Sequence, residues 1–439
     1  MRKFATTTGL AAALSAPALP VLAQNPGDTV MNKGDAAWMM VSTLLVLMMI
    51  LPGLALFYGG LVRSKNMLSV LMQCTLITAM VMAIWVIYGY SFAFGGATGP
   101  FWGGTAKLFL AGVTAESMAP TFTDGVVIPE YVFIAFQMTF AAITPALIVG
   151  AFAERIRFSA LLVFTLLWVT CVYFPVAHMV WDGAGLIFQM GALDFAGGTV
   201  VHVNAGVAAL AGAIMVGRRA GFGRDMMAPH SMTLTMVGAA LLWVGWFGFN
   251  AGSNLEANGG AGLAMINTFT APAGAILAWC AIEAALRGKA SMLGAASGMI
   301  AGLVAVTPAA GTAGPVGAMA LGAIASGVCY FFVSTVKSAL GYDDSLDVFG
   351  IHGIGGIVGA IGTGIFTAPG LGGTGGGDYS MAGQTWIQIQ AIAITIAWSG
   401  IGSVLLFGLA DMVLGLRVSE ETERQGLDLA EHGESAYHA

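Results

Sequence analysis

Residues 194–216 read DFAGGTVVHVNAGVAALAGAIMV, running from Asp194 through His202 to Val216. The stretch 196–216 contains no Asp, Glu, Lys or Arg, and its length is close to the roughly 20 apolar residues that a helix needs to cross a bilayer. It therefore predicts a membrane-spanning helix. Because burying an ionisable group in lipid is costly, His202 inside that helix indicates a functional site.

The composition of the whole chain agrees with this prediction. Of 439 residues, 57% are apolar and only 9% are charged, whereas a soluble domain has about 25% charged residues. These values exclude a soluble enzyme, a disordered protein and a nucleic-acid binder. The 63 glycines favour helices that pack closely in lipid. A β-barrel is excluded because the apolar runs are continuous rather than alternating. We predict an all-α polytopic membrane protein.

Runs of this kind recur along the chain and predict eleven transmembrane helices. The predicted spans are 37–60, 67–95, 129–153, 158–181, 196–216, 233–252, 263–286, 291–310, 316–338, 348–367 and 386–410.

The orientation follows from the charges between the spans. With the N-terminus outside, Lys33 and Lys107 lie outside, and the remaining lysines and arginines after Lys3 lie inside, as the positive-inside rule requires. The inside set is Arg63, Lys65, Arg155, Arg157, Arg218, Arg219, Arg224, Arg287, Lys289, Lys337, Arg417 and Arg424.

The chain divides into four segments. Residues 1–23 resemble a cleaved signal peptide, because Arg2 and Lys3 precede a short apolar stretch and Val21-Leu22-Ala23 offers a cleavage site. Residues 24–36 then form a periplasmic N-terminus, 37–410 form the membrane domain, and 411–439 form a cytoplasmic tail.

An internal repeat relates two of the spans. Asp194 precedes His202 by eight residues, and Asp344 precedes His352 by the same interval, with small residues after each histidine. The histidines lie five spans apart, and an odd repeat unit reverses direction in the membrane. We therefore expect an inverted five-helix repeat over about 37–216 and 233–367, with a site near the midplane and the eleventh helix at the periphery.

Two facing histidines can share one proton between ring nitrogens and so offer both a hydrogen-bond donor and an acceptor. The alternative is a structural histidine bonded to a carbonyl, and a metal site is disfavoured because no Cys or carboxylate stands nearby. Asp194 and Asp344 each begin a helix. They either cap that helix or, for Asp194, support cation binding at the outer mouth; both readings stay open here.

Aromatic residues gather near the outer ends of the predicted spans, where they act as interfacial belt residues or line a vestibule that attracts a cation through their rings. Ser253 adds a hydroxyl one turn after Phe249. The aromatic set is Phe136, Phe140, Trp181, Trp246 and Phe249.

Four motifs carry a resemblance to a known family: DFAGGTVVH (194–202), GWFGFNAGS (245–253), AERIR (153–157) and DVFGIHG (347–353). They resemble the ammonium transporter (Amt/Rh) family, most closely its bacterial members, and the likeness covers nearly the whole mature chain. One departure is Asp182 beside Trp181, where bacterial relatives commonly have glycine.

The resemblance implies a homotrimer in the cell inner membrane with one pore per subunit. It places Trp181, Phe140 and Ser253 at an outer ammonium site that Asp194 supports. Phe140 and Phe249 then form a stacked gate with Phe136 beside it, and His202 and His352 are the twin histidines of the pore.

On this reading the protein recruits ammonium or methylammonium, removes its proton, and conducts ammonia, with or without the proton, into the cytoplasm. It is not an enzyme and needs no cofactor or metal. The alternatives are an ammonium sensor that signals through its tail and a neutral-gas channel of the Rhesus type.

The tail also matches the family, in which it packs on the cytoplasmic face and helps to dock a trimeric PII-type regulatory protein. We expect an ordered tail with Leu427 and Leu429 as apolar anchors. We also expect Arg417 and Arg424 to pair with carboxylates on loops of the same or a neighbouring subunit.

Overall fold

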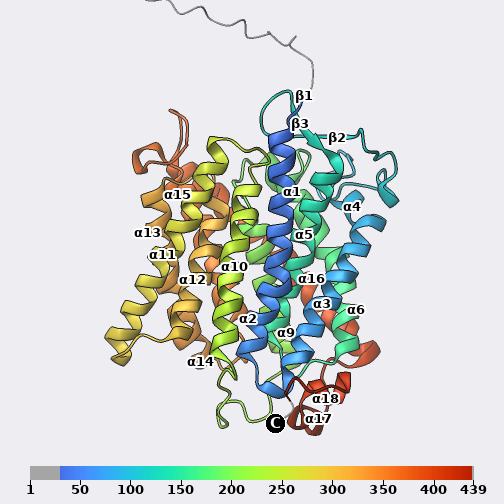
Figure 1. The fold of residues 1–439 in the computed structure, drawn as a ribbon, viewed down its shortest axis with the longest axis vertical. Helices are drawn as coiled ribbons and strands as arrows, with labels where there is room; N and C mark the ends of the chain where they lie inside the picture. The colour runs from blue at the N-terminus through green and yellow to red at the C-terminus, as the bar shows by residue number, and fades with distance from the viewer. Residues whose placement is uncertain (1–29, 438–439) are drawn as a thin grey trace, which may run out of the picture.

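The structure, a computed structural model, describes residues 30–437, so the predicted signal peptide lies outside the described residues. Within them, eleven helices are long and apolar enough to cross a membrane (Figure 1). They are Lys33–Leu61, Ser64–Phe94, Glu130–Ala151, Phe158–Gln189, Gly198–Val216, Met232–Gly252, Gly259–Arg287, Met292–Ala309, Pro315–Leu340, Phe349–Phe366 and Met381–Leu414. Each predicted span coincides with one of these helices, which confirms the predicted fold class.

Most spanning helices combine α-helix with a π-helical or 3₁₀ turn, inside the span or at one of its ends. The α-helices are α1 (Lys33–Met48), α2 (Ala55–Leu61), α3 (Met67–Ile84), α4 (Tyr90–Phe94), α5 (Glu130–Ile148), α6 (Phe158–Trp168), α7 (Phe174–Trp181), α8 (Leu186–Gln189), α9 (Asn204–Val216), α10 (Met232–Gly252), α11 (Gly259–Arg287), α12 (Met292–Val306), α13 (Pro315–Phe331), α14 (Lys337–Leu340), α15 (Ile354–Phe366), α16 (Met381–Leu414), α17 (Glu420–Gln425) and α18 (Leu427–His432). The π-helical turns are η1 (Met49–Leu54), η3 (Trp85–Gly89), η6 (Val169–Tyr173), η7 (Gly198–Val203), η9 (Phe332–Val336) and η10 (Phe349–Gly353).

The two repeats meet where η7 and α9 cross η10 and α15. A Cβ atom built on Gly206, four residues after His202, would lie 2.2 Å from Cα of Gly353. In the reciprocal contact, a Cβ atom on Gly356, four residues after His352, would lie 3.0 Å from Cβ of His202. Glycine therefore lets the two helices approach closely. Each repeat contributes a glycine four residues after its histidine, as expected for an inverted repeat.

The eleventh helix, α16, packs on α6, α9 and α15 and carries many exposed apolar side chains. It is the least buried of the eleven, as expected for a peripheral helix.

A small sheet adds to the helical fold. β1 (Val30–Met31) pairs in parallel with β3 (Val126–Pro129), and β2 (Met118–Pro120) pairs with β3 in the antiparallel direction. Figure 1 shows this sheet at the end of the molecule opposite α17 and α18. We call these two ends the sheet face and the tail face.

The tail is ordered as two short helices on the tail face. Leu427 is completely buried, and its backbone N–H donates to Oδ1 of Asn66 at 2.8 Å. Asp428 accepts from the N–H groups of Leu68 and Ser69 and so caps α3. Leu429, in contrast, is 56% exposed, so within this chain only one of the two predicted anchors is buried.

The predicted partners of the tail arginines also differ within this chain. Arg417 pairs with Glu423 at 2.7 Å, and Arg424 pairs with Glu420 at 2.7 Å, so both bind glutamates of the tail itself. Glu423 also contacts a loop, by accepting from the N–H of Ala220 at 2.6 Å. Pairing an arginine with a glutamate close in sequence costs little conformational entropy of the chain, so these local partners are favoured.

Candidate functional site

A vestibule opens on the sheet face. Its volume is about 540 Å³, and it is lined by every residue predicted for the outer site. The indole N–H of Trp181 donates to the carbonyl oxygen of Asp194 at 3.0 Å, which fixes the ring at the wall. The Ser253 hydroxyl donates to the carbonyl oxygen of Phe249 at 2.8 Å, so its oxygen stays available as an acceptor. The predicted outer-site residues are Phe140, Trp181, Asp194 and Ser253.

Stacked phenylalanines close the bottom of this vestibule. The rings of Phe140 and Phe249 lie 4.2 Å apart, centroid to centroid, with 26° between their planes. Phe136 contacts Phe140 edge-on at 4.9 Å, and Trp181 does so at 5.7 Å. Phe140 lines the vestibule and Phe249 lines the cavity below it, so this pair separates the two spaces.

The two histidines face each other in that lower cavity. Nδ1 of His202 lies 3.2 Å from Nδ1 of His352, and both side chains are buried. His202 also stacks on Trp246, with 5.5 Å between ring centroids, and its Nε2 has no hydrogen-bond partner among the described residues. Each histidine lies in the π-helical turn that begins its spanning helix, η7 or η10. Such turns are rare and occur often at functional sites.

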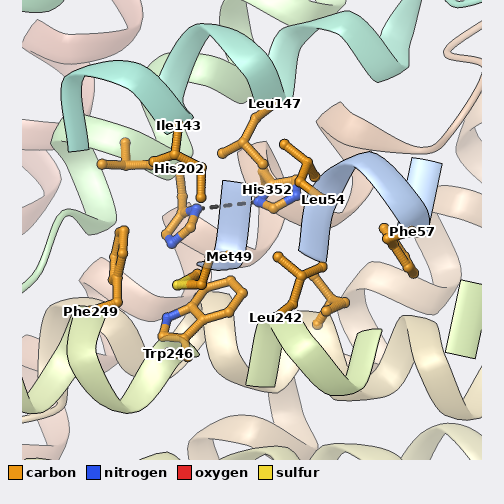
Figure 2. Close-up of a pocket in the computed structure, with 12 residues that line it drawn as sticks. Met49, Leu54, Phe57, Ile143, Leu147, His202, Leu242, Trp246, Phe249 and His352 are labelled. Carbon is orange, nitrogen blue, oxygen red and sulfur yellow. Dashed lines mark hydrogen bonds between the residues drawn. The ribbon is translucent and has the colours of Figure 1, made fainter. Parts of the chain in front are cut away.

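Figure 2 shows this central cavity, with Phe249 at the His202 end and Phe57 beyond His352. Its volume is about 10 Å³, which is enough for about one molecule the size of water. None of the described residues that line it carries a formal charge. The lining residues are Met49, Leu54, Phe57, Ile143, Leu147, Val201, His202, Leu242, Trp246, Phe249, Ile300 and His352.

A second vestibule, of about 390 Å³, opens toward the tail face. Phe57, Ile300 and His352 line both this vestibule and the central cavity. The three spaces therefore follow one another through the molecule, from the sheet face through the phenylalanine pair and the histidines to the tail face.

Both repeat-related aspartates cap helices. Asp194 accepts from the N–H groups of Gly197, Gly198, Thr199 and Val200 and from the Thr199 hydroxyl. Asp344 accepts from the N–H groups of Val348 and Phe349. Each cap holds the start of a π-helical turn that carries a histidine, so these aspartates position the pair.

A charged cluster on the tail face joins four loops. Arg63 and Arg219 bind Glu154, and Arg219 also pairs with Asp343 at 2.8 Å. Burial favours protonation of both carboxylates, but the arginines outweigh it and hold the pKa of Glu154 and of Asp343 below the usual range. Buried Arg155 donates to several carbonyl oxygens, including that of Asp343 at 2.6 Å, and burial lowers its pKa to about 10.

One buried histidine is not among the site residues predicted from the sequence. His178 lies within the predicted span 158–181, and both of its ring nitrogens contact carbonyl oxygens. An ionisable residue inside an apolar run is the signal that would have found it.

Comparison with known proteins identifies the family. A model of the Ammonium Transporter Family matches residues 37–437. The ammonium transporter of Aquifex aeolicus is 47% identical over 412 residues, which cover 93% of this chain and 94% of that protein. The crystal structure of Candida albicans Mep2 is similar with a TM-score of 0.82 and 35% identity, covering 92% of this chain and 90% of the other. A structure titled sensor Amt protein has a TM-score of 0.83 and 29% identity, covering 91% and 98%. The chain therefore belongs to the ammonium transporter family, and its function is ammonium transport across a membrane.

Proposed function

We propose that ammonium binds in the sheet-face vestibule, loses its proton there, and crosses the central cavity as ammonia. The observation that carries this proposal is the narrow central cavity, which has no charged lining residue and is closed by two stacked phenylalanines. An unpaired cation in such a space pays a desolvation cost of several kcal/mol. A neutral ammonia molecule avoids most of that cost.

The vestibule residues then bind the cation before it loses its proton. The rings of Trp181 and Phe140 attract it through their faces, and the Ser253 oxygen accepts one of its hydrogen bonds. The oxygens of Asp194 are already occupied by donors of η7, so this residue supports the site by holding the structure around it.

The histidine pair suits ammonia because of how two neutral rings share a proton. One Nδ1 donates to the other across 3.2 Å, which leaves one Nε2 as an acceptor and the other as a donor. A molecule that both donates and accepts hydrogen bonds can interact with each ring in turn.

The distribution of charge supports the orientation in this proposal. The arginines and lysines of the loops after the odd-numbered spans lie on the tail face, so we assign this face to the cytoplasm and the sheet face to the outside of the cell inner membrane. Residues 1–23 then act as a cleaved signal peptide, 24–36 lie in the periplasm, and 411–439 in the cytoplasm. The active form is a homotrimer that a PII-type protein regulates at the tail face.

A sensor that signals through its tail is the second candidate function. It is favoured by the similarity to a structure whose title names a sensor. A sensor binds ammonium without rapid flux, whereas a neutral-gas channel of the Rhesus type conducts without cation recruitment.

Uptake into liposomes, measured together with membrane current, tests the proposal. We expect ammonium flux that excludes potassium, and we expect the double variant His202→Ala/His352→Ala to alter flux or selectivity while the protein stays folded. Unchanged flux and unchanged potassium exclusion in that variant would refute the role of the histidines. Saturable ammonium binding without flux in the wild-type protein would favour the sensor instead.

A further inference from the structure

His178 in α7 lies among carbonyl oxygens next to the sheet-face vestibule. Its side chain is completely buried. Nδ1 lies 2.8 Å from the carbonyl oxygen of Ala93, and Nε2 lies 2.8 Å from the carbonyl oxygen of Gly99. Each nitrogen is thus within hydrogen-bond distance of a group that can only accept.

A neutral imidazole has one N–H, so it can satisfy only one of these two carbonyl oxygens and would set its other lone pair against the second. A ring that carries a proton on each nitrogen donates to both. The charge of such a ring needs a partner when it is buried. Within the described residues that partner is Asp182, whose Oδ2 lies 3.9 Å from Nδ1 of His178. Two further charged residues that bond to α4, Lys107 and Glu130, are paired with each other at 2.9 Å.

We propose that His178 and Asp182 form an ion pair that positions Trp181 at the outer ammonium site. The inference rests on the proposed function, because it concerns the vestibule assigned there to cation binding. The two residues are four apart, and Trp181 lies between them at the last position of α7.

The surrounding hydrogen bonds show how the pair acts on the tryptophan. His178 joins α7 to Ala93 in α4 and to the loop that follows, and the N–H of Leu186 donates to Pro100 in the same loop at 3.0 Å. Asp182 caps the turn after α7 by accepting from the N–H of Ala184 at 2.9 Å. The backbone of Trp181 is therefore held before it by His178 and after it by Asp182. Without the charge of Asp182 the ring of His178 becomes neutral and loses one of its two hydrogen bonds to carbonyl oxygens.

The charge state of His178 is measured directly by NMR of protein carrying ¹⁵N-labelled histidine in lipid bilayers. We expect His178, assigned by the loss of its signals in His178→Gln, to show two protonated ring nitrogens at pH 7.5. In Asp182→Asn, which keeps the acceptor for Ala184, we expect a neutral ring. A neutral His178 in the wild-type protein, or an unchanged charged ring in Asp182→Asn, would overturn the ion pair.

Uptake kinetics of methylammonium test the positioning role. We expect Asp182→Asn to raise the half-saturating concentration about threefold to tenfold, as for partial loss of one cation–π contact, with a maximal rate within about twofold of wild type. Asp182→Glu keeps the charge and should stay within about twofold of wild type in both quantities; it also serves if the Asn variant does not fold. Glu116→Gln, which removes an exposed charge elsewhere on the sheet face, is the matched control and should change neither.

The variant Trp181→Leu separates the two proposals. If it raises the half-saturating concentration and Asp182→Asn does not, the positioning role is wrong and the outer site stands. If Trp181→Leu has no effect either, the outer site itself is wrong, and the positioning role falls with it.

Discussion

At the scale of single residues, Asp194 and Asp344 share a capping role but differ in their surroundings. Asp194 accepts from five donors at the edge of an open vestibule, whereas Asp344 accepts from two N–H groups and is completely buried beside Asp347. Burial raises the pKa of Asp344, and the negative charge of Asp347 raises it further, although Lys337 opposes this. A raised pKa means that the folded protein binds this proton more tightly than the unfolded chain does.

This linkage predicts a pH dependence of stability. Below neutral pH and above about 4, the usual pKa of aspartate, folded Asp344 takes up a proton that unfolded Asp344 does not. The contribution of Asp344 to stability should therefore rise as the pH falls from 7.5 to 5.5, and Asp344→Asn should lose that contribution. The measurement is the melting temperature, followed by tryptophan fluorescence at both pH values. Asp378→Asn, at an exposed aspartate, is the control, and equal pH slopes in wild type and Asp344→Asn would contradict the prediction.

At the scale of elements, the close crossing of the two histidine-bearing helices depends on glycine. A methyl group at Gly206 would overlap the backbone of Gly353, and backbone cannot move aside as a side chain can. We expect Gly206→Ala to destabilise the protein by about 1–3 kcal/mol, the usual cost of overpacking. Because the histidines lie beside this contact, uptake should fall as well.

Gly356→Ala and Gly262→Ala are the controls that show whether the loss of stability depends on the space around the glycine. The first places its methyl 3.0 Å from Cβ of His202 and from the backbone nitrogen of Val203, a milder overlap than the 2.2 Å at Gly206, and should cost less than Gly206→Ala. The second meets no atom within 4 Å and should be neutral. Thermal unfolding in detergent ranks the three. A Gly206→Ala protein as stable as Gly262→Ala would show that the helices do not need this contact distance.

The elements also show what the sequence could predict and what it could not. Continuous apolar runs marked the eleven spans because lipid demands them, and the repeat of Asp and His predicted that His202 and His352 would meet. The π-helical turns that carry both histidines left no such signal, since their residues are as apolar as the α-helices around them. The short strands escaped because three or four residues in a Gly-, Pro- and Thr-rich segment show no periodicity.

The limits of prediction at the site have a similar cause. The sequence shows which residues are charged but not which of them pair. Arg63 and Arg219 therefore indicate only the orientation of the chain, and their shared partner Glu154 could not be predicted. Pairing depends on distances between loops that are remote in sequence.

At the scale of the whole molecule, the tail and four loops form one charged layer on the tail face. Glu154, Arg219 and Asp343 join the loops, and Glu423 and Asp428 fasten the tail to residues 217–231 and to the start of α3. The carboxylates of the tail thus hold it in part, by accepting from backbone N–H groups, and each such contact is worth about 0.5–2 kcal/mol by analogy with helix caps. Backbone bonds of Leu416 and Val418 to residues 155–157 and the bond from Leu427 to Asn66 also hold it.

Removing these contacts should release the tail without disturbing the membrane domain. We expect truncation after Arg417 to lower transport and to weaken the association with a trimeric PII-type protein, while insertion into the membrane stays normal. In the proposed homotrimer, three tails meet a three-fold partner and act together, so a modest loss at each contact should lower the overall affinity strongly. The double variant Glu423→Gln/Asp428→Asn should reproduce the effect in a full-length chain, because it weakens both fastenings.

The control for that double variant is Glu434→Gln, which removes an exposed carboxylate of the tail and should leave both quantities unchanged. Three measurements separate the steps: limited proteolysis reports whether the tail is released, liposome uptake reports transport, and binding of the purified trimeric partner reports docking. Release of the tail with normal transport and full partner affinity would deny the tail a regulatory role. A tail that stays protected in the double variant would show instead that Leu427 and the remaining contacts suffice to hold it, so the carboxylates would not be the fastening.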